Sequence, residues 1–384
     1  MEMWTDGTLV VQACESTGTV RALRDFAVIG ESKAEHLGWK TPLAVDVTAD
    51  RIWAGHRLQE FRLSDVSPVA THEDRVWRVA GLGGGRLAAV LPPVDGVCRL
   101  AVGQPGRWER EVPLDDLGDA APGLAATGDR PVSRAIGGDP TLTATADGLV
   151  VADGQRGVVA HFSPDLELLG LWYSGGADEA DLTGYAAARG VLVTARWAAR
   201  DSRVGWLTPS GAEHLRDSYS AFAMPAGDDR VWLVGGFKVE LLSHDGTSVA
   251  SARAPRGLVE AAHASGPWCA IGTTDSVQIS AATDDRIAVR TISVGGLVDM
   301  VATFDGDFND AARSLVMGAI SRHSAGHGCS FHEAEDHQVH VLLPKVRPGA
   351  EDDVEQAVLA AGATHVGIGD PTRSPKCCSS RLAR

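Results

Sequence analysis

Asp50-Arg51-Ile52-Trp53 recurs almost unchanged as Asp74-Arg75-Val76-Trp77 and as Asp229-Arg230-Val231-Trp232. Each of the three stretches reads as a polar turn that leads into a short apolar strand. Looser versions begin at Asp6 and Asp147. A repeated supersecondary unit cannot bury its apolar face alone, so several units must pack on one another. The sequence therefore predicts a repeat architecture, and it says much less about chemistry.

The polar turn before the best strand of each unit gives the period of the repeat. These turns lie at Asp6, Asp50, Gly85, Asp147, Arg189, Asp229 and Ser265. Their separations are 44, 35, 62, 42, 40 and 36 residues. Apart from the 62, the separations approach the period of a four-stranded propeller blade, roughly 40–45 residues. The pattern predicts seven blades, with six or eight as the alternatives because the third unit is irregular.

One unit shows the expected strands well, at residues 220–224, 230–234, 239–243 and 248–251. The first strand of each unit should be the most crowded, because all blades converge on the axis. The segments 44–48, 141–145, 185–188 and 260–264 are accordingly rich in small residues. Large side chains fall elsewhere, and we expect them to pack between neighbouring sheets rather than to stack on a ligand. They are Trp53, Trp77, Trp232 and Trp268.

The two ends of the repeat suggest how the ring closes. Residues 296–302 repeat the pattern of residues 257–263, but no second strand follows them. At the other end, the chain begins at Asp6 with a second strand and has no first strand before it. We therefore expect residues 297–303 to supply the missing first strand, a clasp that removes exposed sheet edges. Over residues 4–305 the chain resembles seven-bladed β-propellers with NHL-type or quinoprotein-type blades, which implies an all-β fold.

The expected domains are a β-propeller over residues 1–305, a small α/β module over 306–370 and a flexible basic tail over 371–384. Residues 105–140 are rich in Gly, Pro and Asp and are expected to form an insert, either a lid or partner contact or a plain surface excursion. In the module, the apolar periodicity predicts a helix over 308–320, capped by Asp307 or Asn309. A strand over 337–343 ended by Pro344, a helix from Glu351 to Gly362 and a strand over 364–368 should follow.

Composition excludes some classes of partner. The 384 residues carry a formal net charge of −15, which argues against nucleic acid because phosphate binding needs a positive face. A cationic ligand is compatible with this charge. The basic residues are 30 Arg and only five Lys, a bias typical of GC-rich bacterial genes. The six cysteines show no paired spacing, and no secretory or membrane-spanning segment stands out. We expect a reduced, soluble, cytoplasmic protein.

Five of the thirteen histidines lie within residues 323–340. Imidazole, thiolate and carboxylate groups bind zinc and related metals, so this density predicts a divalent metal such as Zn²⁺, Mg²⁺ or Ca²⁺. The spacing matches no zinc signature, and a solvated polar loop is the alternative. The candidate ligands are His323, His327, His332 and His337.

A second hypothesis for this stretch is a Cys/His pair. Cys329 could act as a thiolate nucleophile activated by His340, with a structural cysteine as the alternative. Residues 323–363 are faintly similar to the CheD-type glutamine deamidases, which implies a hydrolase-deamidase activity with Cys329 and His340 as its catalytic residues. The distance in sequence from Cys329 to His340 is short for that family.

On the propeller, the loops between second and third strands offer polar residues near the expected mouth of the channel. Propeller enzymes such as gluconolactonases and streptogramin lyases, which this architecture resembles, place polar residues or a metal there. The Arg and Trp enrichment suits an anionic or aromatic ligand. The candidate ligand-binding residues are His56, Asp153, Arg156, Arg196, Trp197, Arg200 and Lys238.

Two functions remain open from the sequence. The first is a scaffold that binds a partner protein or a small ligand at the mouth of the channel. The second is an enzyme, either a metal-assisted lyase or hydrolase on the propeller or a thiol-dependent activity in the C-terminal module. The scaffold is favoured because no catalytic triad or metal-ligand set has a supporting context, and fold alone does not decide.

Overall fold

The structure is a computed structural model. It describes residues 1–368 apart from 26, 39, 125–134, 138–139, 174–180, 198–200, 219, 228, 236–237, 256–258, 274–275, 284, 294–297, 306–307, 324–329, 334–337 and 347–350. Two compact units make up the chain, Met1–Ser293 and Val294–Arg384. Neither described helix has the length and apolar content that crossing a membrane requires.

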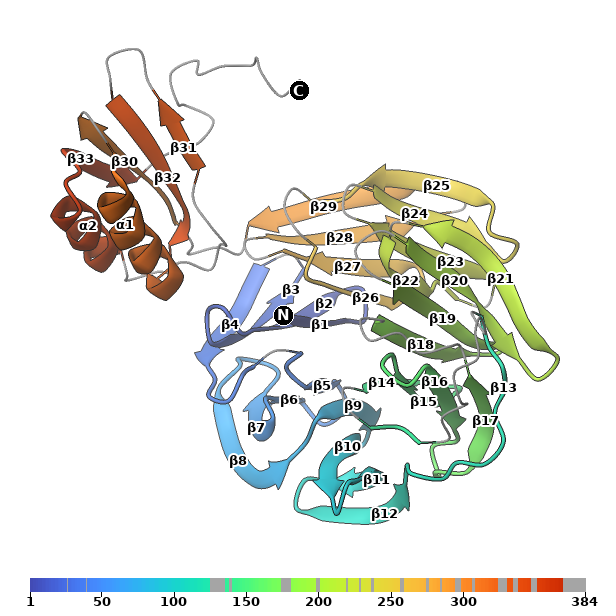
Figure 1. The fold of residues 1–384 in the computed structure, drawn as a ribbon. Coiled ribbons are helices and arrows are strands. Elements are labelled where there is room, and N and C mark those ends of the chain that lie inside the picture. The colour runs from blue at the N-terminus through green and yellow to red at the C-terminus, as the bar shows by residue number, and fades with distance from the viewer. Residues whose placement is uncertain are drawn as a thin grey trace. The chain divides into compact units, whose positions relative to one another are not determined.

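The first unit consists of sheets built on four antiparallel strands that follow one another in sequence, and one of these sheets carries a fifth strand (Figure 1). The first sheet contains β1 (Glu2–Thr5), β2 (Leu9–Cys14), β3 (Thr19–Arg24) and β4 (Ala27–Lys33). The second contains β5 (Leu43–Asp46), β6 (Arg51–Ala54), β7 (Arg57–Arg62) and β8 (Pro68–Arg75). The third contains β9 (Arg78–Gly83), β10 (Arg86–Val94), β11 (Val97–Gln104) and β12 (Arg107–Pro113).

The next sheets repeat this plan. The fourth contains β14 (Thr141–Thr145), β15 (Gly148–Asp153), β16 (Val158–Phe162) and β17 (Leu168–Tyr173), and β13 (Ala121–Pro122) pairs parallel with β17. The fifth contains β18 (Asp181–Ala187), β19 (Gly190–Trp197), β20 (Asp201–Thr208) and β21 (Gly211–Ser218). The sixth contains β22 (Ser220–Pro225), β23 (Arg230–Gly235), β24 (Lys238–Ser243) and β25 (Ser248–Arg253). The seventh contains β26 (Ala261–Ser265), β27 (Trp268–Gly272), β28 (Ser276–Ala282) and β29 (Ile287–Ser293).

This mostly β architecture of repeated four-stranded sheets is consistent with a propeller. Each of the seven turns singled out in the sequence precedes the second strand of a sheet. The cores lie between neighbouring sheets: Trp53 packs with Val79 and Leu87 of the third sheet. Trp232 packs with Cys269 and Ile271 of the seventh. The expectation that large Trp side chains fill the space between sheets is confirmed for these two residues.

Two details of the repeat differ from the sequence prediction. Asp74-Arg75-Val76-Trp77 is not a turn followed by a second strand, because Arg75 ends β8 and Trp77 lies in the link to β9. Part of the expected insert 105–140 is regular, since Arg107–Pro113 is the fourth strand of the third sheet. Leu114 and Ile136, 0% and 2% exposed, anchor the connection beyond that strand in the core between the third and fourth sheets.

The predicted strand clasp is wrong. The first sheet already has its first strand, because β1 pairs with β2 from Glu2 opposite Ala13 to Thr5 opposite Val10. The segment 297–303 lies in β30 (Val298–Asp305), which pairs with two strands of the second unit. Met300 and Val10 are therefore in different sheets. The physical reason is that β30 buries Met300, Ala302 and Phe304 in the core of that unit.

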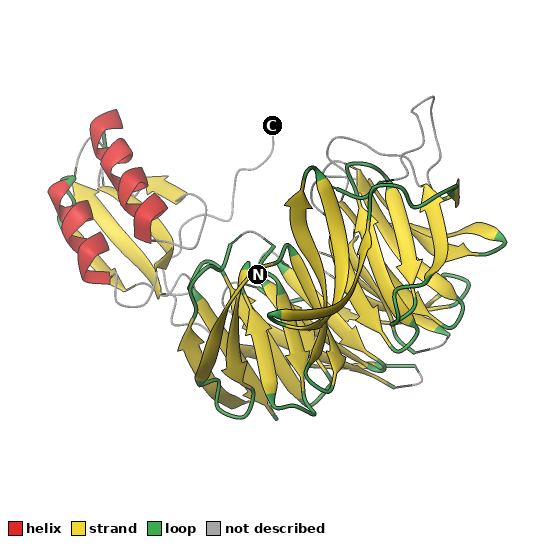
Figure 2. Cartoon of the chain, turned by 90° about the horizontal axis from the view of Figure 1, so that it is seen from below, coloured by secondary structure: helices red, strands yellow, loops and turns green. Residues whose placement is uncertain are grey.

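The second unit is a β-α-β-β-α-β module, the split arrangement of ferredoxin-like domains. Its elements are β30, α1 (Asp310–His323), β31 (Ser330–Glu333), β32 (Gln338–Val346), α2 (Glu351–Ala360) and β33 (His365–Ile368), and the antiparallel sheet has the order β31-β32-β30-β33. Both helices lie on one face of the sheet (Figure 2). The Asn309 carboxamide caps α1 by accepting the Ala312 N–H at 3.0 Å. The prediction that Pro344 ends the strand over residues 337–343 is wrong, since β32 continues to Val346.

Candidate functional site

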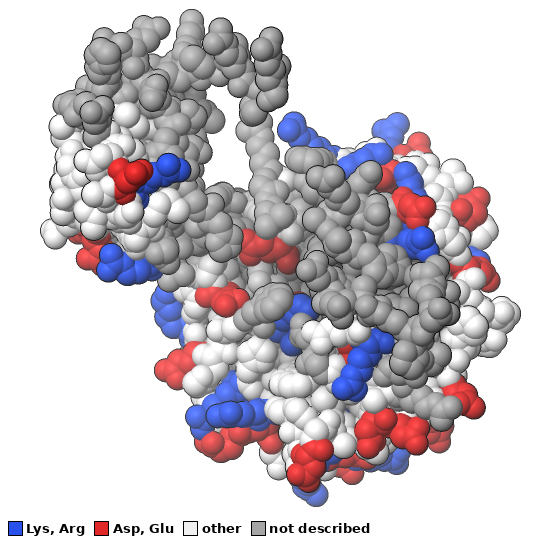
Figure 3. All heavy atoms as spheres, in the orientation of Figure 1, with Lys and Arg blue, Asp and Glu red and all other residues white. Residues whose placement is uncertain are grey.

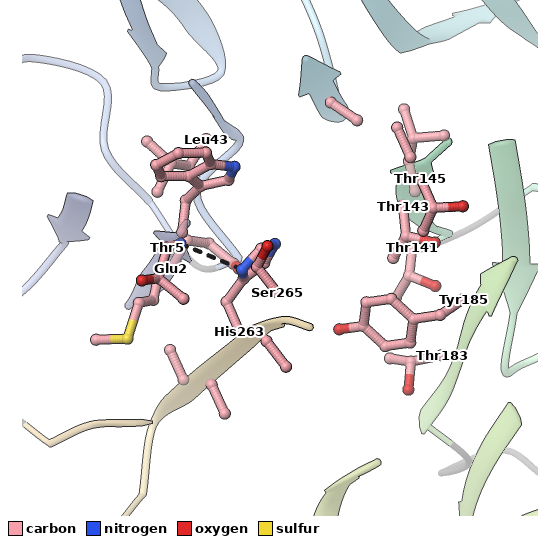
Figure 4. Close-up of a pocket in the computed structure, with 18 of the residues that line it drawn as sticks. Glu2, Thr5, Leu43, Thr141, Thr143, Thr145, Thr183, Tyr185, His263 and Ser265 are labelled. Carbon is pink, nitrogen blue, oxygen red and sulfur yellow. Dashed lines mark hydrogen bonds between the residues drawn. The ribbon is translucent and has the colours of Figure 1, made fainter. Parts of the chain in front are cut away.

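A cavity of about 1000 Å³ lies in the first unit and is lined by the first strand of every one of its sheets. This common lining explains the small residues of these strands, because bulky side chains would fill the space where the sheets converge. Figure 4 shows part of its wall. One lining residue from each sheet in turn is Glu2, Leu43, Arg78, Ala144, Tyr185, Phe222 and His263.

Charged residues lie at the end of the cavity where the first strands begin. Glu2 starts β1, Lys40 precedes β5 and Arg78 starts β9. Burial raises the pKa of the Glu2 carboxyl, while the positive charges of the Met1 amino group, Arg78 and Lys40 oppose that rise. Arg78 Nη1 donates to the Lys40 carbonyl at 3.3 Å, which ties the two basic residues together. A desolvated acid beside two bases is an arrangement that can orient a polar ligand.

His263 lies where the first and seventh sheets meet. Its Nδ1 accepts the Thr5 backbone N–H at 3.2 Å (Figure 4). Its ring centroid is 6.2 Å from that of Trp4. Burial lowers the pKa of His263 to about 4. A neutral imidazole that accepts at Nδ1 carries its proton on Nε2. His263 is therefore a donor at Nε2.

The fourth and fifth sheets meet through threonines. The hydroxyls of Thr141, Thr143 and Thr145 donate to the carbonyls of Leu182, Gly184 and Ala186, the first and third at 3.0 and 2.9 Å. These bonds satisfy the free edge of β18, whose other edge pairs with β19. Opposite His263, the Tyr185 hydroxyl points into the cavity (Figure 4). Burial raises the pKa of Tyr185 far above its ordinary value, so this group is a neutral phenol.

The described ligand-binding candidates from the sequence lie in or beside turns between second and third strands. Since Leu43 pairs with Ala54 and Thr141 pairs with Ala152, these turns lie at the edge where the first strands begin. Asp153 is fully buried and accepts the N–H groups of Gly137 and Arg156 at 2.8 and 3.1 Å, so it holds its own loop.

The other described candidates in these turns also contact their own sheets. His56 Nδ1 is 3.2 Å from the Val76 carbonyl, and Lys238 Nζ is 2.8 Å from Glu240 Oε1. The lining of the cavity, where the structure describes it, does not include Asp153, Arg156, His56 or Lys238. Contacts of this kind favour a local structural role for these side chains.

The remaining candidates lie wholly or partly outside the described residues. These are the side chains of Arg196, Trp197, His323 and His332, and the whole of Arg200, His327, Cys329 and His337. His340 is described, and its Nδ1 is 3.1 Å from Thr303 Oγ1. In the backbone register, His332 is opposite His340. No group of three or more His, Cys, Asp or Glu able to hold a metal occurs among the described residues. The metal and thiol hypotheses stay predictions.

The sequence predicted several of the strands that line the cavity but did not single out their polar residues. Tyr185 and His263 stood in the small-residue segments, where they are the polar exceptions. The sequence pattern did not point to Glu2, because β1 has only four residues and too short an alternation of buried and exposed positions to be predicted as a strand. On the face of the molecule shown in Figure 3, acidic and basic residues are interspersed over the described surface, and no described patch of one sign stands out on that face.

No protein-family model and no curated protein matches the chain. Similar solved structures include the computationally designed protein Ika8, with 14% identity over 88% of this chain and 94% of that chain and a TM-score of 0.43. Another is Hsv2 of Kluyveromyces lactis, with 8% identity over 77% and 98% and a TM-score of 0.47. A third is apo AztD of Citrobacter koseri, with 10% identity over 77% and 86% and a TM-score of 0.43. With TM-scores below 0.5, these similarities carry no conclusion about function.

Proposed function

We propose that the first unit is a closed seven-bladed β-propeller and that its axial cavity binds a small polar ligand. Closure would come from packing of the first sheet on the seventh, through the Thr5 to His263 hydrogen bond and the contact of Gly7 with Trp268. The observation that carries the proposal is the cavity itself. It is lined by every first strand, and Glu2, Lys40 and Arg78 lie at one end.

The size and lining of the cavity support a small-molecule site over a protein-binding face. Ligand pockets usually measure about 300–1,000 Å³ and combine apolar walls with a few placed polar groups. Here Ala, Val and Leu residues with Trp4 and Phe222 form the apolar walls, and hydroxyl and charged side chains lie among them. Under this proposal the turns that carry His56, Arg156 and Lys238 surround the mouth of the cavity.

A substitution that fills the cavity tests the proposal. Ala262 lies on β26 and lines the cavity, so Ala262→Phe should occupy ligand space. Ala288 is exposed on β29 of the same sheet, and Ala288→Phe is the matched control. The full chain is screened by thermal shift against a small-metabolite library, and hits are measured by calorimetry. We expect Ala262→Phe to weaken binding at least about tenfold, which is about 1.4 kcal/mol, and Ala288→Phe to leave it unchanged. Equal affinity in both variants contradicts an axial site.

A further inference from the structure

Three hydroxyl groups gather on one wall of the cavity. Thr183 and Tyr185 lie on β18, and Thr194 lies on β19 directly opposite Thr183. Directly paired residues of an antiparallel sheet point to the same face, and so do residues two apart on a strand. All three side chains line the cavity, and Phe222 of the sixth sheet lines it beside them. We call Thr183, Tyr185 and Thr194 the hydroxyl niche.

None of these hydroxyls has a hydrogen-bond partner among the described residues. Thr194 is only 3% exposed, and its Oγ1 is a buried oxygen without a partner. The threonines of β14 provide the contrast within the same cavity, because each donates to a carbonyl of β18. Buried polar atoms in folded proteins are nearly always paired, and a group that is not paired needs an explanation. A bound polar molecule supplies the missing partners.

The charges in the cavity decide what kind of molecule fits. Its lining carries three acids, Glu2, Asp147 and Glu260, and three positive groups, Lys40, Arg78 and the Met1 amino group, so the formal charges balance. Away from the charged end of the cavity, the polar groups of the niche and of the opposite wall are uncharged: three hydroxyls, and the Nε2–H of His263. A hydroxyl both donates and accepts, so it matches another hydroxyl better than it matches an ion.

We propose that the hydroxyl niche recognises an uncharged polyhydroxylated ligand of the sugar or sugar-alcohol class. This inference rests on the proposed ligand-binding function of the cavity. The ligand hydroxyls take and give hydrogen bonds at Thr183, Tyr185 and Thr194, and His263 donates from the far wall. Trp4 and Phe222 provide apolar surface for the C–H groups of the ligand.

The test compares three probes that share one pyranose skeleton but differ in charge: glucose, glucuronate and glucosamine. Mannitol and maltose extend the neutral set. Binding to the full chain is measured by saturation-transfer NMR and calorimetry. We expect one or more neutral probes to bind and the two charged probes to bind at least about tenfold more weakly.

The variant Thr194→Val removes the unpaired hydroxyl and keeps the shape of the side chain. We expect it to lower the affinity for the neutral probe at least about tenfold, with a Tm in the absence of ligand that is unchanged or higher by about 2 °C. The control is Thr208→Val in the same sheet, because the Thr208 hydroxyl donates to the Gly211 carbonyl at 3.0 Å and does not line the cavity. Thr208→Val should lower the Tm by about 2 °C and keep the affinity.

The outcomes separate this inference from the function on which it rests. Binding of charged compounds alone overturns the sugar-class ligand and leaves the cavity as a site. If none of the neutral probes binds, the inference is also overturned. The library screen with Ala262→Phe then decides whether the cavity binds any other small molecule. A clear loss of Tm in ligand-free Thr194→Val shows that its hydroxyl has a partner in the folded chain, which removes the basis of the proposal.

Discussion

His263, which lies where the first and seventh sheets meet, makes the stability of the folded chain depend on pH. Its pKa is lowered to about 4 by burial, whereas an unfolded histidine titrates near 6.5. Between pH 6.5 and pH 4 the unfolded chain therefore binds a proton at this residue that the folded chain does not, so stability falls as the pH falls through that window. We expect this residue to remove up to about 3 kcal/mol of unfolding free energy between pH 7 and pH 4. Urea denaturation at each pH measures the loss.

His263→Gln isolates this effect, because a glutamine oxygen can accept the Thr5 N–H and does not titrate. The variant should lose less stability than the natural chain between pH 6.5 and pH 4. Glu2 has the opposite sign, since its raised pKa favours the folded state as the pH falls, but it is present in both proteins and cancels in the comparison. Parallel pH profiles for the two proteins contradict a neutral His263 in the joint.

Single residues were the hardest features to predict from the sequence. The repeat predicted that residues 185–188 and 260–264 are first strands near an axis, yet it could not predict that Tyr185 and His263 line a cavity. The direction of a side chain depends on strand register, and a shift of one residue reverses it. Thr194 looked like an ordinary strand residue, because its lack of a partner is a property of the packed sheets alone.

At the scale of single elements, the turn between β1 and β2 has no room for a side chain at Gly7. Gly7 has φ +105°, and a Cβ at this position would lie 2.3 Å from Cδ1 of Trp268 in the seventh sheet. Gly7→Ala therefore adds a clash between two sheets to the cost of a left-handed alanine. We expect a loss of about 2–4 kcal/mol in unfolding free energy, measured by chemical denaturation.

The matched control is Gly227→Ala in the turn between β22 and β23. Gly227 has φ +93° but no atom within 4 Å of a Cβ, so only the backbone cost of about 1–2 kcal/mol applies. If the two variants lose the same amount, the contact of Gly7 with Trp268 is not what holds the first and seventh sheets together.

Elements with a strong turn signal were predicted best. The Asp-Gly and Asp-Arg turns located the second strand of the first, second, fourth and sixth sheets, because such turns have a definite backbone requirement. The same sequence pattern gave a wrong prediction at residues 74–77. Trp77 lies in the link between β8 and β9 and packs into the core from that link. β1 and β31 were missed, since strands of four residues carry too few alternations to stand out.

The whole molecule depends on which strands become partners, and local patterns do not encode that choice. Residues 297–303 alternate as a propeller strand does, but β30 is a central strand of the second unit, with β32 on one side and β33 on the other. Its buried face packs on Val316 of α1 and on Val354 and Val358 of α2. Alternation alone is the same in both settings, so the sequence predicted the sheets and their period but not the closure.

Truncation tests this division of the chain. A protein of residues 1–293 keeps every strand of the first unit. We expect it to be monomeric, with a Tm within about 2 °C of the corresponding transition in the full chain. A protein of residues 1–305 adds β30 without its partners and exposes Met300, Ala302 and Phe304 on an unpaired strand. Such an edge invites association, so this longer protein should aggregate more, as light scattering would show. If residues 297–303 instead closed the first sheet as a clasp, the 1–305 protein would be stable and the 1–293 protein unstable. That result would contradict the division and place β30 in the first sheet.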